Sequence, residues 1–289
     1  LMRDFRDRVA VITGGASGVG RALGVRLATE GARVVLADID QARLDATAAE
    51  IAADTGAQVV GIKVDVTKAE SVDALADAVY DRFGAAHLVF NNAGVGLGEA
   101  QRTFWDLPVN DWHWGFDVNV FGVVYGIRSF VPRMLAGGEE GVIINTSSGN
   151  GGLRSLPNTP IYAASKAAVT SMSEVLHQQF LREGDKLRAA VLFPGPHVVN
   201  TSILASKRNR PDGYGAADDN KPAYETMEDL VRTTGLKMAL TEPEEVAAFA
   251  LEGVREGRFW LLPESAENDT KLRERMDNIL ERSNPVSAW

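Results

Sequence analysis

The chain has 289 residues, of which 45% are hydrophobic and 24% are charged, as in an ordinary globular protein. Its net charge of −9 and the lack of a basic stripe exclude a general nucleic-acid binder, and the lack of cysteine excludes disulfides and thiolate catalysis. No apolar run approaches the roughly 18 residues that cross a bilayer, and the charged first residues lack a signal-peptide core, so we expect a cytoplasmic protein with no membrane partner.

Short apolar runs rich in β-branched residues alternate along the chain with longer segments of helical period. Runs that are apolar throughout indicate strands buried on both faces, as in a parallel sheet with crossover helices. Seven such strands predict a doubly wound α/β fold, with sheet order 3-2-1-4-5-6-7 and helices on both faces. We expect one domain over residues 1–289. The predicted strands are Arg8–Thr13, Arg33–Asp38, Gln58–Val64, His87–Asn91, Gly141–Ser147, Leu187–Phe193 and Arg258–Leu262.

Three helix starts carry capping signals. Asp40 follows the second strand, where its carboxylate can accept a hydrogen bond from the first turn of the next helix. Thr67–Glu70 and Thr241–Glu244 both have the spacing of a capping box. We therefore expect helices to begin at these three positions.

Two segments interrupt the alternation. Residues 203–240 are polar, with a helical stretch from about Tyr224 to Lys237, and we expect this insertion to cover a ligand at the carboxyl edge of the sheet. Residues 264–283 follow the last strand and are predicted to form an amphipathic helix, whose charges we interpret as a solvated face.

A glycine-rich turn directly follows the first strand and opens a helix. Glycines let the backbone approach a pyrophosphate closely, and the helix N-terminus supplies free N–H groups and positive potential. The spacing is G-x-x-x-G-x-G rather than G-x-G-x-x-G. The residues predicted to bind a dinucleotide here are Thr13, Gly14, Ser17, Gly18, Val19 and Gly20.

Asp38 ends the second strand and is the predicted determinant of the dinucleotide. A carboxylate at this position can accept hydrogen bonds from the ribose hydroxyls and repels a 2′-phosphate. Ile39 follows it, and Arg43 is the one local cation that would favour the phosphate. We therefore expect NAD rather than NADP. A simple capping role for Asp38 is less favoured, because Asp40 already fits that role.

Tyr162 and Lys166 are four residues apart in the segment I-Y-A-A-S-K-A-A-V. Residues at this spacing share one face of a helix. A free tyrosine has a pKa near 10, and a neighbouring cation favours its phenolate. The pair can therefore move a proton to or from an alcohol oxygen, although this spacing alone also occurs by chance.

The chain combines the motifs above with Asn91–Gly94, Asn119 and Ser148. In this combination it resembles the short-chain dehydrogenase/reductase superfamily, in particular its NAD-preferring subgroup with a core of roughly 250 residues. The resemblance covers about residues 9–262 and implies a Rossmann-like fold. It also implies a homodimer or homotetramer. Because His87, His113, His177 and His197 show no ligand spacing, we expect no metal site.

The resemblance assigns roles to individual residues. It implies that Tyr162 is the acid/base and that Lys166 binds the nicotinamide ribose and lowers the tyrosine pKa. It also implies that Ser148 steadies the substrate oxygen and that Asn119 holds a water in the proton path. Asn119 can also be read as an ordinary polar residue in a helix. Further cofactor contacts are implied at Asp65, Val66, Asn92, Ala93, Gly94, Pro194, Gly195 and Val198.

Two departures from the family pattern leave alternatives open. The gap from Ser148 to Tyr162 is one residue longer than the commonest spacing, which we assign to an extra loop residue. The threonine expected soon after Pro194–Gly195 is displaced, so Asn200 or Thr201 takes its place. His197 either faces the substrate or is an ordinary loop residue.

The segments expected around the substrate are Leu97–Trp105, Leu153–Thr159, His197 and residues 203–240. Their apolar and aromatic residues favour a hydrophobic secondary alcohol or its ketone, such as an aromatic carbinol, a terpenoid alcohol or a hydroxysteroid. The aromatic residues before Asn119 either serve packing or a subunit contact or line this pocket; they are Trp105, Trp112, Trp114 and Phe116. Two alternatives remain: a silent dinucleotide-binding sensor or scaffold, and a nucleotide-sugar epimerase or dehydratase.

Overall fold

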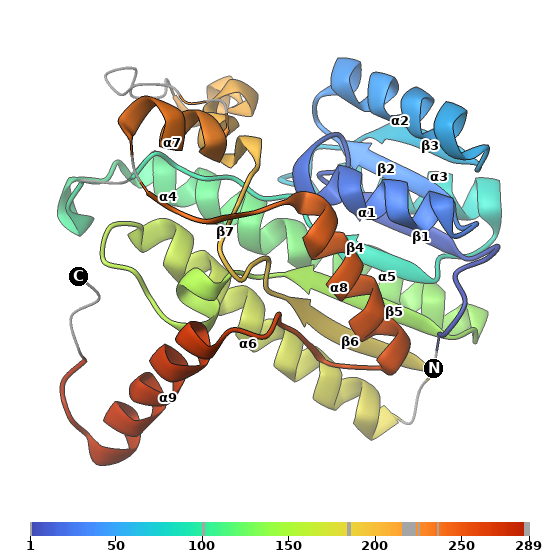
Figure 1. The fold of residues 1–289 in the computed structure, drawn as a ribbon. Coiled ribbons are helices and arrows are strands. Elements are labelled where there is room, and N and C mark those ends of the chain that lie inside the picture. The colour runs from blue at the N-terminus through green and yellow to red at the C-terminus, as the bar shows by residue number, and fades with distance from the viewer. Residues whose placement is uncertain are drawn as a thin grey trace.

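A seven-stranded parallel sheet forms the centre of the protein (Figure 1). The structure, a computed structural model, describes residues 2–99, 102–183, 186–215, 224, 226–235 and 237–285. The sheet order is β3-β2-β1-β4-β5-β6-β9. Its strands are β1 (Val9–Thr13), β2 (Arg33–Asp38), β3 (Val59–Lys63), β4 (Leu88–Asn91), β5 (Gly141–Thr146), β6 (Leu187–Leu192) and β9 (Trp260–Leu261).

The predicted doubly wound α/β fold and its strand order are confirmed, with β9 as the seventh strand of the sheet. The predicted limits of the strands differ from the observed ones by at most two residues. One parallel pair was not predicted: β7 (Val198–Val199) pairs with β8 (Leu240–Thr241) outside the main sheet. These two-residue strands carry no periodic signal in the sequence.

Helices cover both faces of the sheet because successive side chains of each buried strand point to opposite faces. In β1, Ala10 and Ile12 join one apolar cluster while Val9 and Val11 join the other. The first cluster contains α1 (Gly18–Thr29), α2 (Gln41–Thr55) and α8 (Pro243–Glu256). The second contains α3 (Ala69–Phe83), α5 (Gly122–Gly137) and α6 (Pro160–Glu183). Figure 1 shows α1 and α8 side by side on the near face.

The helix starts agree with the sequence in one case of three. The Asp40 side chain accepts a hydrogen bond from the N–H of Arg43, as predicted. The capping box predicted at Thr67 is wrong, because the Thr67 hydroxyl donates to Asp65 instead and α3 starts after Lys68. The second box is displaced by one residue: Glu242 and Glu245 form it, while Thr241 accepts the N–H of His197.

The segment after β6 and the C-terminal helix extend beyond the sheet. The former contains 3₁₀ turns at Ser202–Asn209 and Asp212–Tyr214, then α7 (Met227–Thr234), shorter than the predicted Tyr224–Lys237. Residues 216–223, 225 and 236 of the predicted insertion lie outside the described residues. The C-terminal helix is α9 (Ala266–Glu281), which projects from the body in Figure 1.

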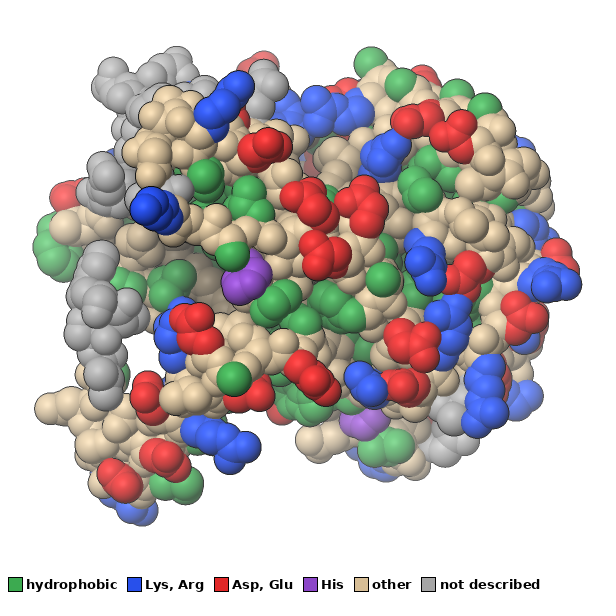
Figure 2. Space-filling model, in the orientation of Figure 1, with side chains coloured by type: hydrophobic (Ala, Val, Ile, Leu, Met, Phe, Trp, Pro, Cys, Tyr) green, Lys and Arg blue, Asp and Glu red, His purple; other side chains and the backbone are tan. Residues whose placement is uncertain are grey.

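Acidic and basic side chains are interspersed on the face shown in Figure 2, without a broad patch of one sign. Within the described ranges, no helix combines the length and apolar character that crossing a bilayer requires.

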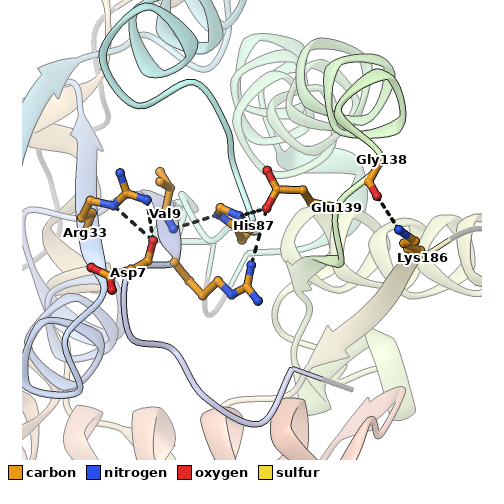
Figure 3. Close-up of polar contacts among 8 residues, drawn as sticks. Asp7, Val9, Arg33, His87, Gly138, Glu139 and Lys186 are labelled. Carbon is orange, nitrogen blue, oxygen red and sulfur yellow. Dashed lines mark hydrogen bonds and ion pairs between the residues drawn. The ribbon is translucent and has the colours of Figure 1, made fainter.

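His87 connects strands at the amino edge of the sheet, opposite the strand ends that carry the predicted site (Figure 3). Its ring is 3% exposed. Nδ1 accepts the N–H of Val9 at 3.0 Å, and Nε2 lies 3.0 Å from a carboxylate oxygen of Glu139. Nδ1 must be unprotonated to accept this bond, so the neutral ring fits the site. Burial lowers the pKa of His87 and outweighs the opposing effect of Glu139.

Replacing His87 by Asn is expected to reduce the loss of stability in mild acid. A lowered folded-state pKa means that His87 contributes stability above its unfolded pKa of about 6.5, and that this contribution is lost as the pH falls. Urea unfolding at pH 7.5 and pH 5.5 measures the difference, with exposed His113→Asn as the control. An equally steep loss in the His87 variant would contradict the assignment.

Candidate active site

A cavity of about 570 Å³ runs along the carboxyl ends of the strands. It begins at the glycine-rich turn after β1, passes the ends of β2, β4 and β5, and continues to Pro263 and α9. The order of the strands reverses between β1 and β4, where open α/β sheets bind their ligands. The cavity therefore has a dinucleotide end and a second end for another molecule.

The turn after β1 has the shape that a pyrophosphate needs. Gly14 has φ +66°, and a Cβ added to it would lie 2.9 Å from Ala93 Cα. Ser17 is the N-cap of α1, but its side chain makes no capping hydrogen bond. This leaves the helix N-terminus available to an anion.

Thr13 and Gly20 lie behind the cavity wall, in contrast to Gly14, Ser17, Gly18 and Val19. The Thr13 hydroxyl bonds the oxygen of Phe90 and accepts the N–H groups of Asn92 and Ala93, at 3.0 and 3.1 Å. A Cβ on Gly20 would approach the oxygen of Gly14 to 2.1 Å. Both residues therefore shape the turn and do not line the cavity, so their direct contact with a dinucleotide stays a prediction.

Asp38 lies at the cavity wall together with Ile39, Asp65 and Val66. One of its carboxylate oxygens accepts the N–H of Ala16 and the other the N–H of Asp40, both at 3.1 Å. These bonds fix the carboxylate at the end of β2, and each oxygen keeps a lone pair for a ligand hydroxyl.

Asn119 lies behind the wall in a π-helical turn, Asp117–Phe121, between α4 (Val109–Phe116) and α5. Its side chain bonds both the N–H and the oxygen of Val95, at 2.8 and 3.2 Å, and donates to the Ser165 hydroxyl. A Cβ on Gly94 would lie 3.4 Å from both Asn119 Oδ1 and Lys166 Nζ. Asn119 thus ties the strand-end segment to α6, and glycine keeps the space between it and Lys166 open.

Ser148, Tyr162 and Lys166 come together at the end of β5. Ser148 Oγ accepts the N–H of Asn150 at 3.2 Å, and Ser148 lies near enough to Tyr162 to lower the pKa of its phenol. Lys166 is 3% exposed, and its Nζ donates to the oxygen of Thr146 at 2.9 Å. This nitrogen lies 5.6 Å from the centre of the Tyr162 ring.

The electrostatics of this group differ from the sequence-based expectation. Burial raises the pKa of Tyr162, the hydrogen bond from Ser148 lowers it, and the charge of Glu99 raises it further. The net pKa of Tyr162 is therefore raised, whereas we expected Lys166 to lower it. Burial lowers the pKa of Lys166 to about 8.

The loop after β6 places Thr201 and Asn200 differently. Pro194, Gly195, Val198 and Thr201 line the cavity. A Cβ on Gly18 would lie 3.1 Å from a methyl carbon of Thr201, so this threonine packs on the glycine-rich turn. Asn200 instead donates to Glu242 and accepts the N–H of Glu228. Thr201, rather than Asn200, is in position to meet a dinucleotide.

The predicted substrate segments contribute to the second end of the cavity. Leu97, Leu153, Leu156, His197, Ile203, Leu204 and Met227 line it, as does Trp114 from α4. Trp105, in contrast, is 81% exposed. Two cations that the sequence did not single out, Arg154 and Arg208, also reach the wall.

The C-terminal helix also forms part of the wall, although we interpreted its charges only as a solvated face. Asn268 and Leu272 line the cavity, and Asn268 donates to the oxygen of Pro196 at 3.1 Å. Their spacing of four residues places them on one face of the helix, which was a usable signal in the sequence. No strand or motif in the sequence indicates, however, that this helix returns to the sheet edge.

Arg210 attaches the segment after β6 to α4. Its guanidinium bonds Asp111 at 2.7 Å, and both side chains are almost fully buried. Arg210 also lies over the Trp114 ring, 5.0 Å from its centre, and donates to the oxygens of Tyr214 and Gly215. These contacts hold residues 202–215 over the cavity.

Comparison with known proteins shows the family of the chain. The model of the short chain dehydrogenase family matches residues 8–212. The chain belongs to the short-chain dehydrogenase family. It is therefore an oxidoreductase acting on CH–OH donors, and the family resemblance noted from the motifs is confirmed.

Three relatives illustrate the similarity. The "CLA biosynthesis dehydrogenase/reductase" of Lactiplantibacillus plantarum is 31% identical, covering 90% of this chain and 89% of its own. The "1-deoxy-11-beta-hydroxypentalenate dehydrogenase" of Streptomyces exfoliatus is 34% identical, covering 95% and 89%. A crystal structure of a short-chain dehydrogenase/reductase from Burkholderia phymatum in complex with NAD is 37% identical, with a TM-score of 0.88 and 99% coverage of both chains.

Replacing Lys166 by Met is expected to remove the pH dependence that the buried ammonium imposes on stability. Its pKa falls from 10.5 to about 8 in the folded protein, so the cost of charging it is full below pH 8 and disappears above pH 10.5. Between pH 7 and pH 10 the wild type should gain roughly 2–3 kcal/mol relative to the variant.

Urea unfolding of both proteins across this pH range measures the change. Lys186→Met is the matched control, because the exposed Lys186 makes the same type of hydrogen bond, to the oxygen of Gly138 at 2.9 Å. A constant difference between wild type and the Lys166 variant at all pH values would show that Lys166 is not a strained buried cation.

Proposed function

We propose that the protein is an NAD-dependent oxidoreductase that interconverts a fairly hydrophobic secondary alcohol and its ketone, with Tyr162 as acid/base. The observation that carries this proposal is the meeting of Ser148, Tyr162 and Lys166 at the cavity wall, where Lys166 Nζ lies 5.6 Å from the centre of the Tyr162 ring. Nicotinamide would take a hydride from the carbinol carbon in the oxidative direction. The remaining chemistry is the movement of one proton.

The protein's own groups handle that proton. The phenolate of Tyr162 takes it from the alcohol oxygen, and Ser148 donates a hydrogen bond that steadies the same oxygen. As long as Lys166 is charged, its ammonium favours the phenolate electrostatically, and its lowered pKa of about 8 limits this effect at higher pH. Because burial holds the pKa of Tyr162 high, we expect oxidation to quicken as the pH rises.

The preference for NAD rests on Asp38. Its carboxylate is fixed at the end of β2 by two backbone N–H groups, where it would accept bonds from ribose hydroxyls and repel a 2′-phosphate. Arg43, the competing cation at this wall, lies 3.9 Å from Asp40. The NAD-bound relative from Burkholderia phymatum supports the same preference.

The apolar wall supports a hydrophobic substrate. Leu97, Trp114, Leu153 and Ile203 surround the space beyond Tyr162, and such walls bind carbon skeletons while a few polar groups orient them. The relative named as a hydroxypentalenate dehydrogenase is consistent with an aromatic carbinol, terpenoid alcohol or hydroxysteroid. A homodimer or homotetramer and a cytoplasmic location stay predictions.

Tyr162→Phe is expected to abolish oxidation of the best substrate in a panel of hydrophobic secondary alcohols. Loss of a general acid/base costs about 100- to 10,000-fold in rate. The formation of reduced cofactor at pH 7 and pH 9 measures this, and Tyr125→Phe is the control at another tyrosine. NAD binding without turnover by the wild type would favour a sensor, and redox-neutral conversion of a nucleotide sugar would favour an epimerase.

Asp38→Asn is expected to shift the cofactor preference toward NADP without changing the shape of the side chain. Removing the charge ends its repulsion of a 2′-phosphate, so the ratio of kcat/KM for NADP to that for NAD should rise by about tenfold, or roughly 1.4 kcal/mol. The exposed Asp54→Asn on α2 serves as the control. Wild-type turnover with NADP in preference to NAD would refute the proposed role.

A further inference from the structure

Glu99 is a buried carboxylate beside the proposed active site. It lies in the segment after β4, is 3% exposed and belongs to the cavity wall. One oxygen accepts the N–H of Ile161 at 2.7 Å, and the other accepts the N–H of Tyr162 at 2.9 Å. Nothing in the sequence around Glu99 indicated a role at the first turn of α6.

The contact satisfies groups that a helix leaves free. The first N–H groups of a helix have no partner within it, and the positive end of the helix dipole favours an anion there. In α6 the first residue, Pro160, has no N–H, and the N–H of Ala163 bonds the oxygen of Thr159. Glu99 bonds the two N–H groups between them, one of which belongs to Tyr162.

We propose that Glu99 is a positioning residue for Tyr162: its carboxylate clamps the first turn of α6 to the segment after β4 and sets both the place and the electrostatic surroundings of the phenol. This inference rests on the proposed acid/base role of Tyr162. The clamp also connects the chemistry to the wall, because Leu97 belongs to the same segment and lines the substrate end.

The charge of Glu99 acts on the phenol as well. It raises the pKa of Tyr162, in the same direction as burial and against the hydrogen bond from Ser148. Glu99 therefore opposes phenolate formation while it holds the ring in place. Other charged or titratable side chains on the surrounding elements are Lys166, Arg154, His197, Arg208, Asp111 and His113.

Two variants of Glu99 separate charge from position. Glu99→Gln removes the charge, so Tyr162 should ionise at lower pH. Because the glutamine side chain holds the first turn of α6 less well than the carboxylate, kcat should also fall by about 10- to 100-fold. Glu99→Asp keeps the charge but shortens the side chain, so kcat should fall with a smaller change in the pH at which Tyr162 ionises. Glu70→Gln, at the exposed start of α3, is the control.

The ionisation of Tyr162 is measured without substrate, from the near-ultraviolet absorbance of phenolate. The titration curve of Tyr162→Phe is subtracted from that of the wild type. In the same way, the curve of the double variant Glu99→Gln, Tyr162→Phe is subtracted from that of Glu99→Gln. Circular dichroism at each pH confirms folding. A midpoint at lower pH in Glu99→Gln, matched by the pH dependence of kcat/KM, supports the proposal. An unchanged midpoint overturns it.

If Glu99→Gln does not fold, amide hydrogen exchange in Glu99→Asp provides the test. Faster exchange at Ile161 and Tyr162 is expected, and unchanged exchange overturns the clamp. The outcomes also separate the two proposals. If the ionisation midpoint of Tyr162 depends on Glu99 but the protein oxidises no alcohol, the proposed function alone is refuted. Alcohol oxidation that depends on Tyr162, with an unchanged midpoint and unchanged exchange, would refute the role of Glu99 alone.

Discussion

The buried ammonium of Lys166, held 2.9 Å from the oxygen of Thr146, is the contact on which the geometry of the site depends. It joins α6 to the end of β5, where Ser148 follows two residues later. The side chain is 3% exposed, so the folded protein carries a cation in poorly solvated surroundings. A more stable protein would place an apolar residue here. We interpret the retained charge as stability given up for chemistry.

The charged form of Tyr162 is also disfavoured by its surroundings. Burial and the charge of Glu99 disfavour the phenolate, while the hydroxyl of Ser148 favours it. These groups come from a strand-end loop, the start of the helix that follows it and the segment after β4, which lies much earlier in the chain. Each is fixed by backbone hydrogen bonds: Ser148 by Asn150, and Glu99 by the first turn of α6. The phenol is thus held by rigid elements.

The cavity has one end built by the sheet and one built by peripheral segments. At the dinucleotide end, Thr13, Gly14 and Asp38 are fixed by contacts among neighbouring strand ends. At the other end, the wall depends on Arg210 bonded to Asp111 and on Asn268 bonded to the oxygen of Pro196. Peripheral segments of this kind tolerate changes in sequence more readily than strand ends packed in a sheet.

The sequence alone determined the parallel sheet, its order and most of the dinucleotide turn, because these depend on local periodicity and on the backbone freedom of glycine. It also indicated the pair Tyr162 and Lys166, since their spacing on one helix is a local property. Only the tertiary structure showed that burial raises the pKa of Tyr162, that Thr201 faces the cavity and that α9 returns to it.

Glu99 shows most clearly why the sequence did not reveal the other features of the site. Its partners lie 62 and 63 residues further along the chain, so no periodicity or motif connects them. Desolvation and long-range charge arise only when distant segments meet, and their size depends on how completely water is excluded. Local pattern determined which groups carry the chemistry, and packing determined their pKa values and their partners.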